Sequence, residues 1–157
     1  ALRTKKVFIS ENPSIVSFLL NQFHSLDPRI EVCSPMLCSS GQPSHAAVLL
    51  LDFLVGEGVH LYYGGDFDVK GLVMAQSMFE RYKGFWHPWG MTTQAINWWE
   101  DHYKDDDSFG QLQTLTRVDW DSGLIEKLIN KGKPIKIFQE MIVSLLFREY
   151  INKHKVR

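Results

Sequence analysis

The stretch that decides the fold runs from His60 to Leu72 and reads HLYYGGDFDVKGL. Its first half is rich in β-forming residues and ends at two glycines, which Asp66 and Asp68 follow. This pattern predicts a strand that stops at a loop with two carboxylates, after which a helix begins. Because ligands of α/β proteins bind beyond the carboxyl ends of the strands, the loop is a candidate functional site.

Short apolar runs alternate with helical patterns on both sides of this stretch. Such alternation indicates an α/β fold in which helices flank a mainly parallel sheet. The run 45–55 has almost no polar face, which predicts a helix buried on most of its sides. Strands are predicted at 6–10, within 30–38, at 59–63 and within 85–90, and helices at 13–26, 45–55 and 69–82.

After residue 90 the pattern changes to helices alone. One is predicted from a cap at Thr92 or Thr93 through Trp99, one over 124–129 from a cap at Asp121 or Ser122, and one from Ile135 to about Asn152. We expect one domain over residues 1–157, with its core at about 5–90 and a helical C-terminal extension at about 91–157. Because a strand-like run follows Ala1 almost at once, we expect the domain to be the C-terminal part of a longer protein.

The composition is that of an ordinary soluble globular protein. Of the 157 residues, 45% are hydrophobic and 22% are charged. The longest apolar stretch is about half of a membrane span and no signal peptide is visible, so we expect a cytoplasmic protein without a membrane partner. The net charge of −1 gives no overall signal for nucleic acid, although residues 126–157 carry eight Lys and Arg against three acids. That basic end could meet phosphates or form a solvated helix face.

Glu11 stands in the same place after the first predicted strand as Asp66 and Asp68 do after the third. If these strands are neighbours in a parallel sheet, three carboxylates meet at one edge. Mg²⁺ prefers oxygen ligands, would relieve the repulsion between the charges, and can activate a phosphodiester. An Asp-x-Asp pair after a strand also serves for loop capping, so the residues by themselves leave a metal site and a structural role open.

The arrangement resembles a known signature. A glutamate at the end of the first strand, with Asp-x-Asp after the third, is characteristic of the Toprim domain of topoisomerases, primases and some nucleases. Three short motifs resemble those of the Toprim-like C-terminal domain of an uncharacterised bacterial family: SENPS at 10–14, CSSGQPS at 38–44 and YGGDFDVKG at 63–71. That family is related to the nuclease subunit of Wadjet anti-plasmid systems and, more distantly, to the topoisomerase VI A subunit. The resemblance covers roughly residues 5–150.

The resemblance implies a site dependent on Mg²⁺ (or Mn²⁺) that acts on DNA phosphodiesters. Asp66 and Asp68 match the metal ligands, and Glu11 matches a glutamate that is a further ligand or a general acid/base. Gly41 matches the glycine turn after the second strand. Family members also carry a Gln-Glu or Glu-Glu pair on the last helix, which Gln139-Glu140 matches and which adds Glu140 to the candidates.

The expected function is therefore a Mg²⁺-dependent nuclease domain in a plasmid-defence assembly, with DNA and other subunits of a multi-protein complex as partners. A catalytically silent DNA-binding or interaction module is the alternative, and a small-molecule phosphohydrolase is a second one. Lys70 could reach a phosphate or be solvated, and the four tryptophans between residues 86 and 99 could stack on bases or pack in the core. Topoisomerase VI-type enzymes use a tyrosine on a winged-helix domain that is not identifiable here, so strand passage by this chain alone is not expected.

Overall fold

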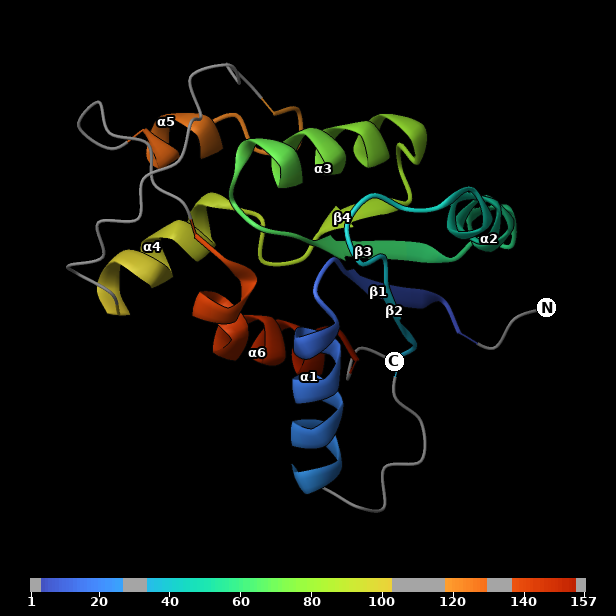
Figure 1. Cartoon of the computed structure of the whole chain (residues 1–157), viewed down its shortest axis with the longest axis horizontal. Helices are drawn as coiled ribbons and strands as arrows, with labels where there is room; N and C mark the ends of the chain where they lie inside the picture. The colour runs from blue at the N-terminus through green and yellow to red at the C-terminus, as the bar shows by residue number, and fades with distance from the viewer. Residues whose placement is uncertain (1–3, 27–33, 103–117, 130–136, 155–157) are drawn as a thin grey trace.

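The computed structural model describes residues 4–26, 34–102, 118–129 and 137–154. Its centre is a sheet in the order β2-β1-β3-β4, with every neighbouring pair parallel (Figure 1). This confirms the predicted α/β fold with a parallel sheet. The strands are β1 (Lys6–Ser10), β2 (Met36–Cys38), β3 (His60–Gly64) and β4 (Trp86–Pro88).

The strand order reverses between β1 and β3. The chain moves outward from β1 to β2, returns past β1 to form β3, and then continues outward on the other side to β4. The connections that follow the adjacent strands β1 and β3 therefore run in opposite directions, which makes this edge of the sheet a topological switch point. This switch point is where open α/β sheets bind their ligands.

Helices cover both faces of the sheet (Figure 1). Helices α2 and α3 lie on one face, and α1 and α6 lie on the other, while α4 and α5 extend the molecule beyond the carboxyl ends of the strands. The helices are α1 (Pro13–Leu26), α2 (His45–Gly56), α3 (Val69–Arg81), α4 (Thr93–His102), α5 (Leu124–Leu128) and α6 (Val143–His154), the last preceded by a short 3₁₀ helix, η2 (Gln139–Ile142).

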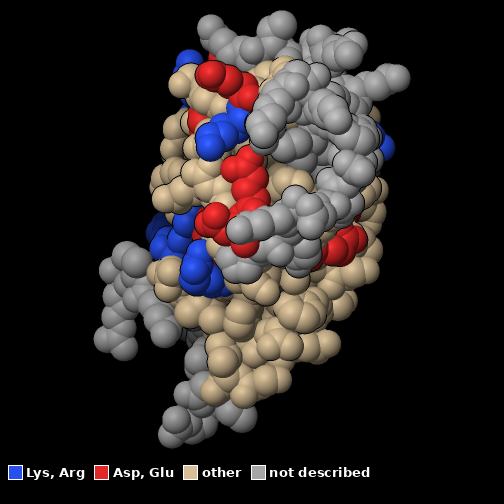
Figure 2. Space-filling model, turned by 90° about the vertical axis from the view of Figure 1, so that its left-hand side faces the viewer, with Lys and Arg blue, Asp and Glu red and all other residues tan. Residues whose placement is uncertain are grey.

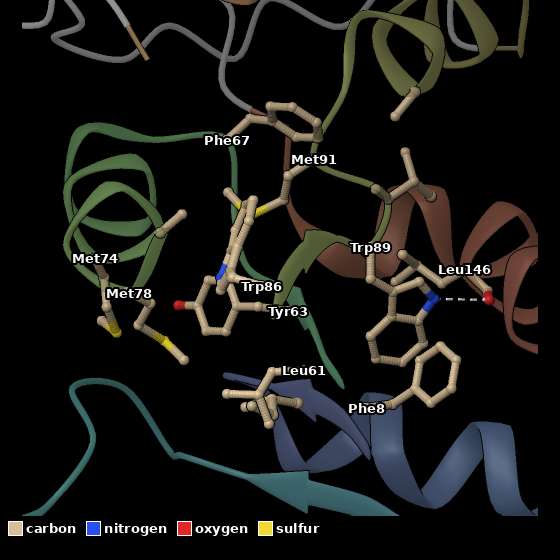
Figure 3. Close-up of a cluster of buried hydrophobic side chains, with 14 of the residues drawn as sticks. Phe8, Leu61, Tyr63, Phe67, Met74, Met78, Trp86, Trp89, Met91 and Leu146 are labelled. Carbon is tan, nitrogen blue, oxygen red and sulfur yellow. Dashed lines mark hydrogen bonds between the residues drawn. The ribbon is translucent and has the colours of Figure 1, made fainter. Parts of the chain in front are cut away.

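The strand register divides the core into two halves. Phe8 of β1 lies opposite Tyr62, and its ring packs edge-on against Tyr150 of α6 with 4.7 Å between ring centroids. The next residue of β3, Tyr63, points to the other face, because side chains alternate along a strand. There it lies beside Trp86 in the cluster that α3 covers (Figure 3). Three of the four tryptophans, Trp86, Trp89 and Trp99, are buried, so they belong to the core.

Helix α2 is not buried on most of its sides, and that prediction is wrong. Leu51 and Leu54 are buried against the sheet, but Leu49 is 55% exposed and Phe53 is 58% exposed. A helix needs only one apolar face to pack on a sheet. The apolar composition of this segment therefore does not determine how many of its side chains are buried.

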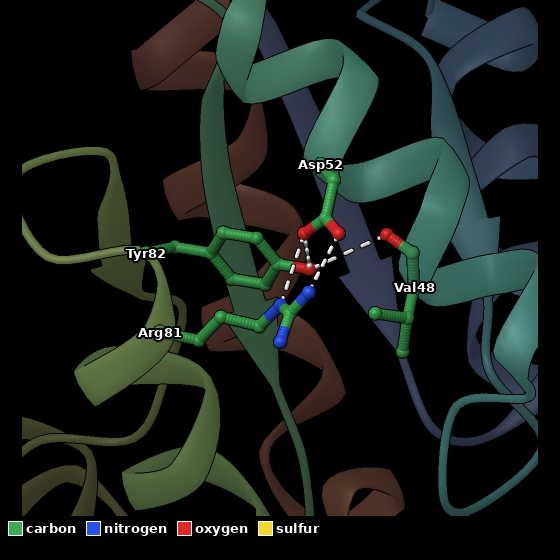
Figure 4. A network of polar contacts seen from close by, with 4 residues as sticks. All are labelled: Val48, Asp52, Arg81 and Tyr82. Carbon is green, nitrogen blue, oxygen red and sulfur yellow. Dashed lines mark hydrogen bonds and ion pairs between the residues drawn. The ribbon is translucent and has the colours of Figure 1, made fainter.

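A polar network joins α2 to α3 (Figure 4). The guanidinium of Arg81 donates two hydrogen bonds to the Asp52 carboxylate, with Nη2–Oδ2 at 2.6 Å and Nε–Oδ1 at 2.9 Å. The Tyr82 hydroxyl donates a third to Asp52 Oδ1 at 3.0 Å. An exposed ion pair adds little free energy of unfolding, so this bidentate contact links the two helices at the surface without contributing much stability. Between them runs a largely apolar groove of about 580 Å³.

The last helix begins later than its sequence pattern predicts. Ile137 forms an antiparallel bridge to Phe67, whose N–H donates to the Ile137 carbonyl at 2.8 Å. Phe138 is extended, η2 follows, and α6 starts only at Val143. The prediction of a helix from Ile135 is therefore wrong at 137–138, because Ile137 pairs with the loop after β3, and residues 139–142 form a 3₁₀ helix in place of an α-helix. Residues 135 and 136 lie outside the described residues.

Two smaller observations complete the fold. Gly123 occupies the N-cap position of α5, and the predicted cap Asp121 instead accepts a hydrogen bond from the Thr93 N–H at 2.8 Å, which ties it to the start of α4. Within the described part of the chain, no helix is long and apolar enough to cross a membrane.

Candidate functional site

The three carboxylates singled out in the sequence all follow the strands at the switch point. Ser10 pairs with Gly64 at the ends of β1 and β3, so Glu11 and the loop from Gly65 to Asp68 leave the sheet side by side. The Glu11 N–H donates to the Gly64 carbonyl at 3.4 Å and extends this pairing by one step. The prediction that the first and third strands are neighbours in a parallel sheet is therefore confirmed.

Glu11 is partly buried and lies among the other acids. Its carboxylate accepts a hydrogen bond from the Tyr63 hydroxyl. Burial raises the pKa of the Glu11 carboxyl above its ordinary value, and the hydrogen bond from Tyr63 opposes that rise. The negative charges of Asp66 and Asp68 raise the same pKa further, because like charges nearby disfavour the charged form of Glu11.

The two aspartates are each oriented by a backbone N–H. Asp68 is the N-cap of α3, and its Oδ1 accepts from the Gly71 N–H at 2.8 Å. Asp66 Oδ1 accepts from the Gln139 N–H at 2.9 Å, across 73 residues of sequence. Asp68 therefore has the structural role of a helix cap, which the sequence left open, and it also lies close enough to Glu11 to affect its pKa.

The segment before α6 closes one side of the site. Gln139 is 1% exposed, and its side chain accepts a hydrogen bond from the Ser10 hydroxyl at 3.0 Å. The next residue, Glu140, is exposed and accepts a hydrogen bond from the Asn12 side chain, so it also lies near the end of β1. Together with the Ile137 bridge, these contacts bind the C-terminal segment to the loops after β1 and β3.

Two glycines, one in this loop and one in the first turn of α3, lie where other groups approach closely. A Cβ at Gly65 would collide with the Glu11 carboxylate, which lies directly against this backbone. A Cβ at Gly71 would collide with the backbone of Asp66, so the first turn of α3 folds tightly over the loop. The glycines in the stretch HLYYGGDFDVKGL therefore fix the positions of two carboxylate-bearing residues.

The other predicted residues lie around this cluster. Lys70 is exposed at the start of α3, and its positive charge lowers the pKa of Glu11, an effect weaker than those of burial and the aspartates. Gly41 lies in the turn after β2 in the left-handed region with φ 97°, as expected for a glycine turn. The basic stretch at 126–157 falls partly outside the described residues.

The donor set fits a hard divalent cation by its chemistry. Glu11, Asp66 and Asp68 offer carboxylate oxygens, which Mg²⁺ and Mn²⁺ prefer, and their mutual repulsion is the kind that a cation relieves. Among the described residues, however, no three side chains of His, Cys, Asp or Glu are gathered closely enough in this structure to hold one ion. Binding would therefore require the aspartates to turn toward the Glu11 carboxylate from their present hydrogen bonds.

The face that carries these residues has charges of both signs. Figure 2 views the molecule from the side toward which the carboxyl ends of the strands point, which is the left side of Figure 1. Acidic side chains gather over the middle of this face, and Lys and Arg side chains lie beside them. A polyanion would meet acids at the centre of this surface, so cations between the acids would favour its approach.

Comparison with protein families identifies the group to which the chain is related. The model of the family described as "Protein of unknown function C-terminus (DUF2399)" matches residues 1–150. The chain belongs to this family. The match to DUF2399 includes all four strands, Glu11, the aspartate loop and the segment that closes the site. No curated protein and no solved structure matched the chain. Since the description of DUF2399 states no activity, the site itself carries the functional argument.

Sequence reasoning missed the residues that hold the acids in place. Tyr63 reads as an ordinary strand residue, and Ser10 as an ordinary strand end, yet both make hydrogen bonds to site residues. The alternation along β3 contains the only signal: Tyr63 shares a face with the buried Leu61, so its hydroxyl requires a partner.

Proposed function

We propose that this chain is a Toprim-like domain that hydrolyses DNA phosphodiesters with the help of Mg²⁺ or Mn²⁺. The observation that carries the proposal is the placement of Glu11, Asp66 and Asp68 directly after the paired strands β1 and β3, where the charges of both aspartates act on the Glu11 carboxyl. The proposed substrate, DNA, and the proposed setting, a bacterial plasmid-defence assembly, are inferred from the resemblance. It lies in the short sequence motifs at 10–14, 38–44 and 63–71, which are similar to those of Toprim and Wadjet-related proteins.

The residues have distinct roles in this proposal. Asp66 and Asp68 hold the cation, and Glu11 completes the site or exchanges a proton with the attacking water or the leaving oxygen. When bound, Mg²⁺ supplies the positive charge that polarises the phosphodiester and stabilises the leaving oxygen.

Plasmid nicking by the purified chain tests the proposal. We expect supercoiled DNA to be nicked with Mg²⁺ or Mn²⁺ and to stay intact with EDTA. Asp68→Asn is the informative variant, because Asn caps a helix about as well as Asp while it removes the negative charge. Outer partners of metal ligands contribute about 10- to 100-fold to activity, so removing this ligand should reduce nicking by about 100-fold or more.

A matched control separates this effect from a general change of charge. Glu57→Gln alters net charge by the same amount, but Glu57 is exposed at the end of α2, next to the edge of the sheet where β3 begins. This variant should nick DNA like the unmodified chain. Nicking that survives EDTA, or that Asp68→Asn leaves unchanged, would contradict the proposal.

A catalytically silent DNA-binding or interaction module is the second candidate. Its support is that each acid already has a protein donor, namely the Tyr63 hydroxyl or the backbone N–H of Gln139 or Gly71. This candidate predicts a shift of DNA in gel electrophoresis without nicking under any metal condition. In that case Asp68→Asn would leave DNA binding unchanged or strengthen it.

A further inference from the structure

Tyr63 is a fully buried tyrosine whose hydroxyl reaches the proposed site. Its exposed fraction is 0%, and its ring lies in the core beside Trp86 (Figure 3). The hydroxyl donates a hydrogen bond to Oε1 of Glu11, which follows the neighbouring strand. A tyrosine hydroxyl is protonated at neutral pH, so the group serves as a donor to the carboxylate.

The place of the Glu11 carboxylate calls for such a donor. The carboxylate lies against the Gly65 backbone, at the place that a Cβ on this residue would occupy. The neighbouring charges of Asp66 and Asp68 repel it there, and burial also disfavours its charged form. The attraction of Lys70 comes from an exposed side chain. Tyr63 is therefore the rigidly held group that keeps the carboxylate at this position.

We propose that Tyr63 is a positioning residue, whose core-anchored hydroxyl holds the Glu11 carboxylate beside the two aspartates. The significance of that position rests on the proposed function, since it is the place where the three acids could share one cation. Because the ring is packed on all sides, the hydroxyl cannot follow Glu11 if the carboxylate turns outward. Partners that orient a metal ligand in this way typically contribute about 10- to 100-fold to metal affinity.

Two neighbouring tyrosines provide a matched pair of variants. Tyr63→Phe removes only the hydroxyl and keeps the ring in the core, and we expect Mn²⁺ affinity, measured by calorimetry on the full chain, to fall about 10- to 100-fold. Tyr62→Phe is the control, because Tyr62 points to the other face of the sheet and stacks on His87. Its Mn²⁺ affinity should equal that of the unmodified chain.

A double variant tests whether Tyr63 acts through Glu11. In Glu11→Gln the charged acceptor is lost, so adding Tyr63→Phe should change Mn²⁺ affinity much less than it does in the unmodified chain. An equal loss in both backgrounds would overturn the proposal, because Tyr63 would then act by another route.

Crystal structures without metal separate this inference from the proposed function. The Glu11 carboxylate should lie against Gly65 in the unmodified chain and be displaced in Tyr63→Phe. If it stays in place in the variant, the positioning role is overturned whatever the metal data show. If it is displaced but the unmodified chain binds no Mn²⁺, the positioning role stands and the metal-dependent function is overturned.

Discussion

The β2–α2 unit and the β3–α3 unit share one local design but occupy different environments. Each consists of a short strand, a connection with glycine, and a helix whose first turn is capped by a side chain. Ser44 caps α2 by accepting from the Ala47 N–H at 3.2 Å, and Asp68 caps α3 in the same way. Only the second cap carries a charge, and only the second connection lies at the switch point.

The packing around the two connections differs as well. A Cβ at Gly41 would meet nothing within 4 Å, so this glycine serves the backbone turn alone. Gly65 and Gly71 are hemmed in by Glu11 and by the backbone of Asp66. Both units use the same strand–turn–helix motif. The candidate site lies at the one whose turn is packed against other residues, whereas the glycine of the turn at the edge of the sheet faces open space.

Truncating one leucine in each helix should reveal the largest difference between the units. Leu72 of α3 is fully buried, so Leu72→Ala should lower the free energy of unfolding by about 2–5 kcal/mol. Leu50 of α2 is 44% exposed, so Leu50→Ala should change it by about 0.5 kcal/mol or less. Urea denaturation measures both, and equal losses would show that the outer face of α2 is covered in solution.

Removing the two caps gives the next largest effect. Ser44→Ala and Asp68→Ala should each lower the free energy of unfolding by about 0.5–2 kcal/mol. Asp68→Asn should keep most of that stability, since Asn is a comparable cap, and yet lose Mn²⁺ affinity. Ser44→Ala should leave Mn²⁺ affinity unchanged. A loss of affinity in Ser44→Ala, or its retention in Asp68→Asn, would remove the functional distinction between the units.

The smallest expected effect is a pH dependence confined to the acidic side. The folded chain raises the pKa of Glu11 above its ordinary value of 4.5, so between these two values it binds more protons than the unfolded chain. The free energy of unfolding should therefore fall as pH rises through this window. Glu11→Gln should show a flatter profile in urea titrations at several pH values, whereas Glu57→Gln should keep the slope of the unmodified chain.

Much of this arrangement follows from the sequence. The strand ending at Gly64, the helix after Asp68 and the matching position of Glu11 after β1 are all local patterns with strong periodicity. Parallel pairing then brings Glu11 beside the aspartate loop, because the carboxyl ends of parallel strands share one edge of the sheet. The fold class and the placement of Glu11 and the two aspartates at one edge of the sheet could be predicted for this reason.

The remainder depends on contacts that no local pattern encodes. The exposure of Phe53 on α2 depends on which elements lie nearby, and the apolar run looks the same either way. The helical pattern before α6 gave no sign that Ile137 pairs with Phe67, or that the Gln139 N–H orients Asp66. These contacts join residues about 70 positions apart, and many segments could compete for such a partner.

The bridge between Phe67 and Ile137 also bears on the order of events during synthesis. The ribosome releases β1, β3 and the aspartate loop long before the segment that supplies the Gln139 N–H to Asp66. Closing so long a loop requires a loss of chain entropy that only the finished core compensates. Asp66 therefore lacks the backbone donor that orients it until the C-terminal segment has been synthesised.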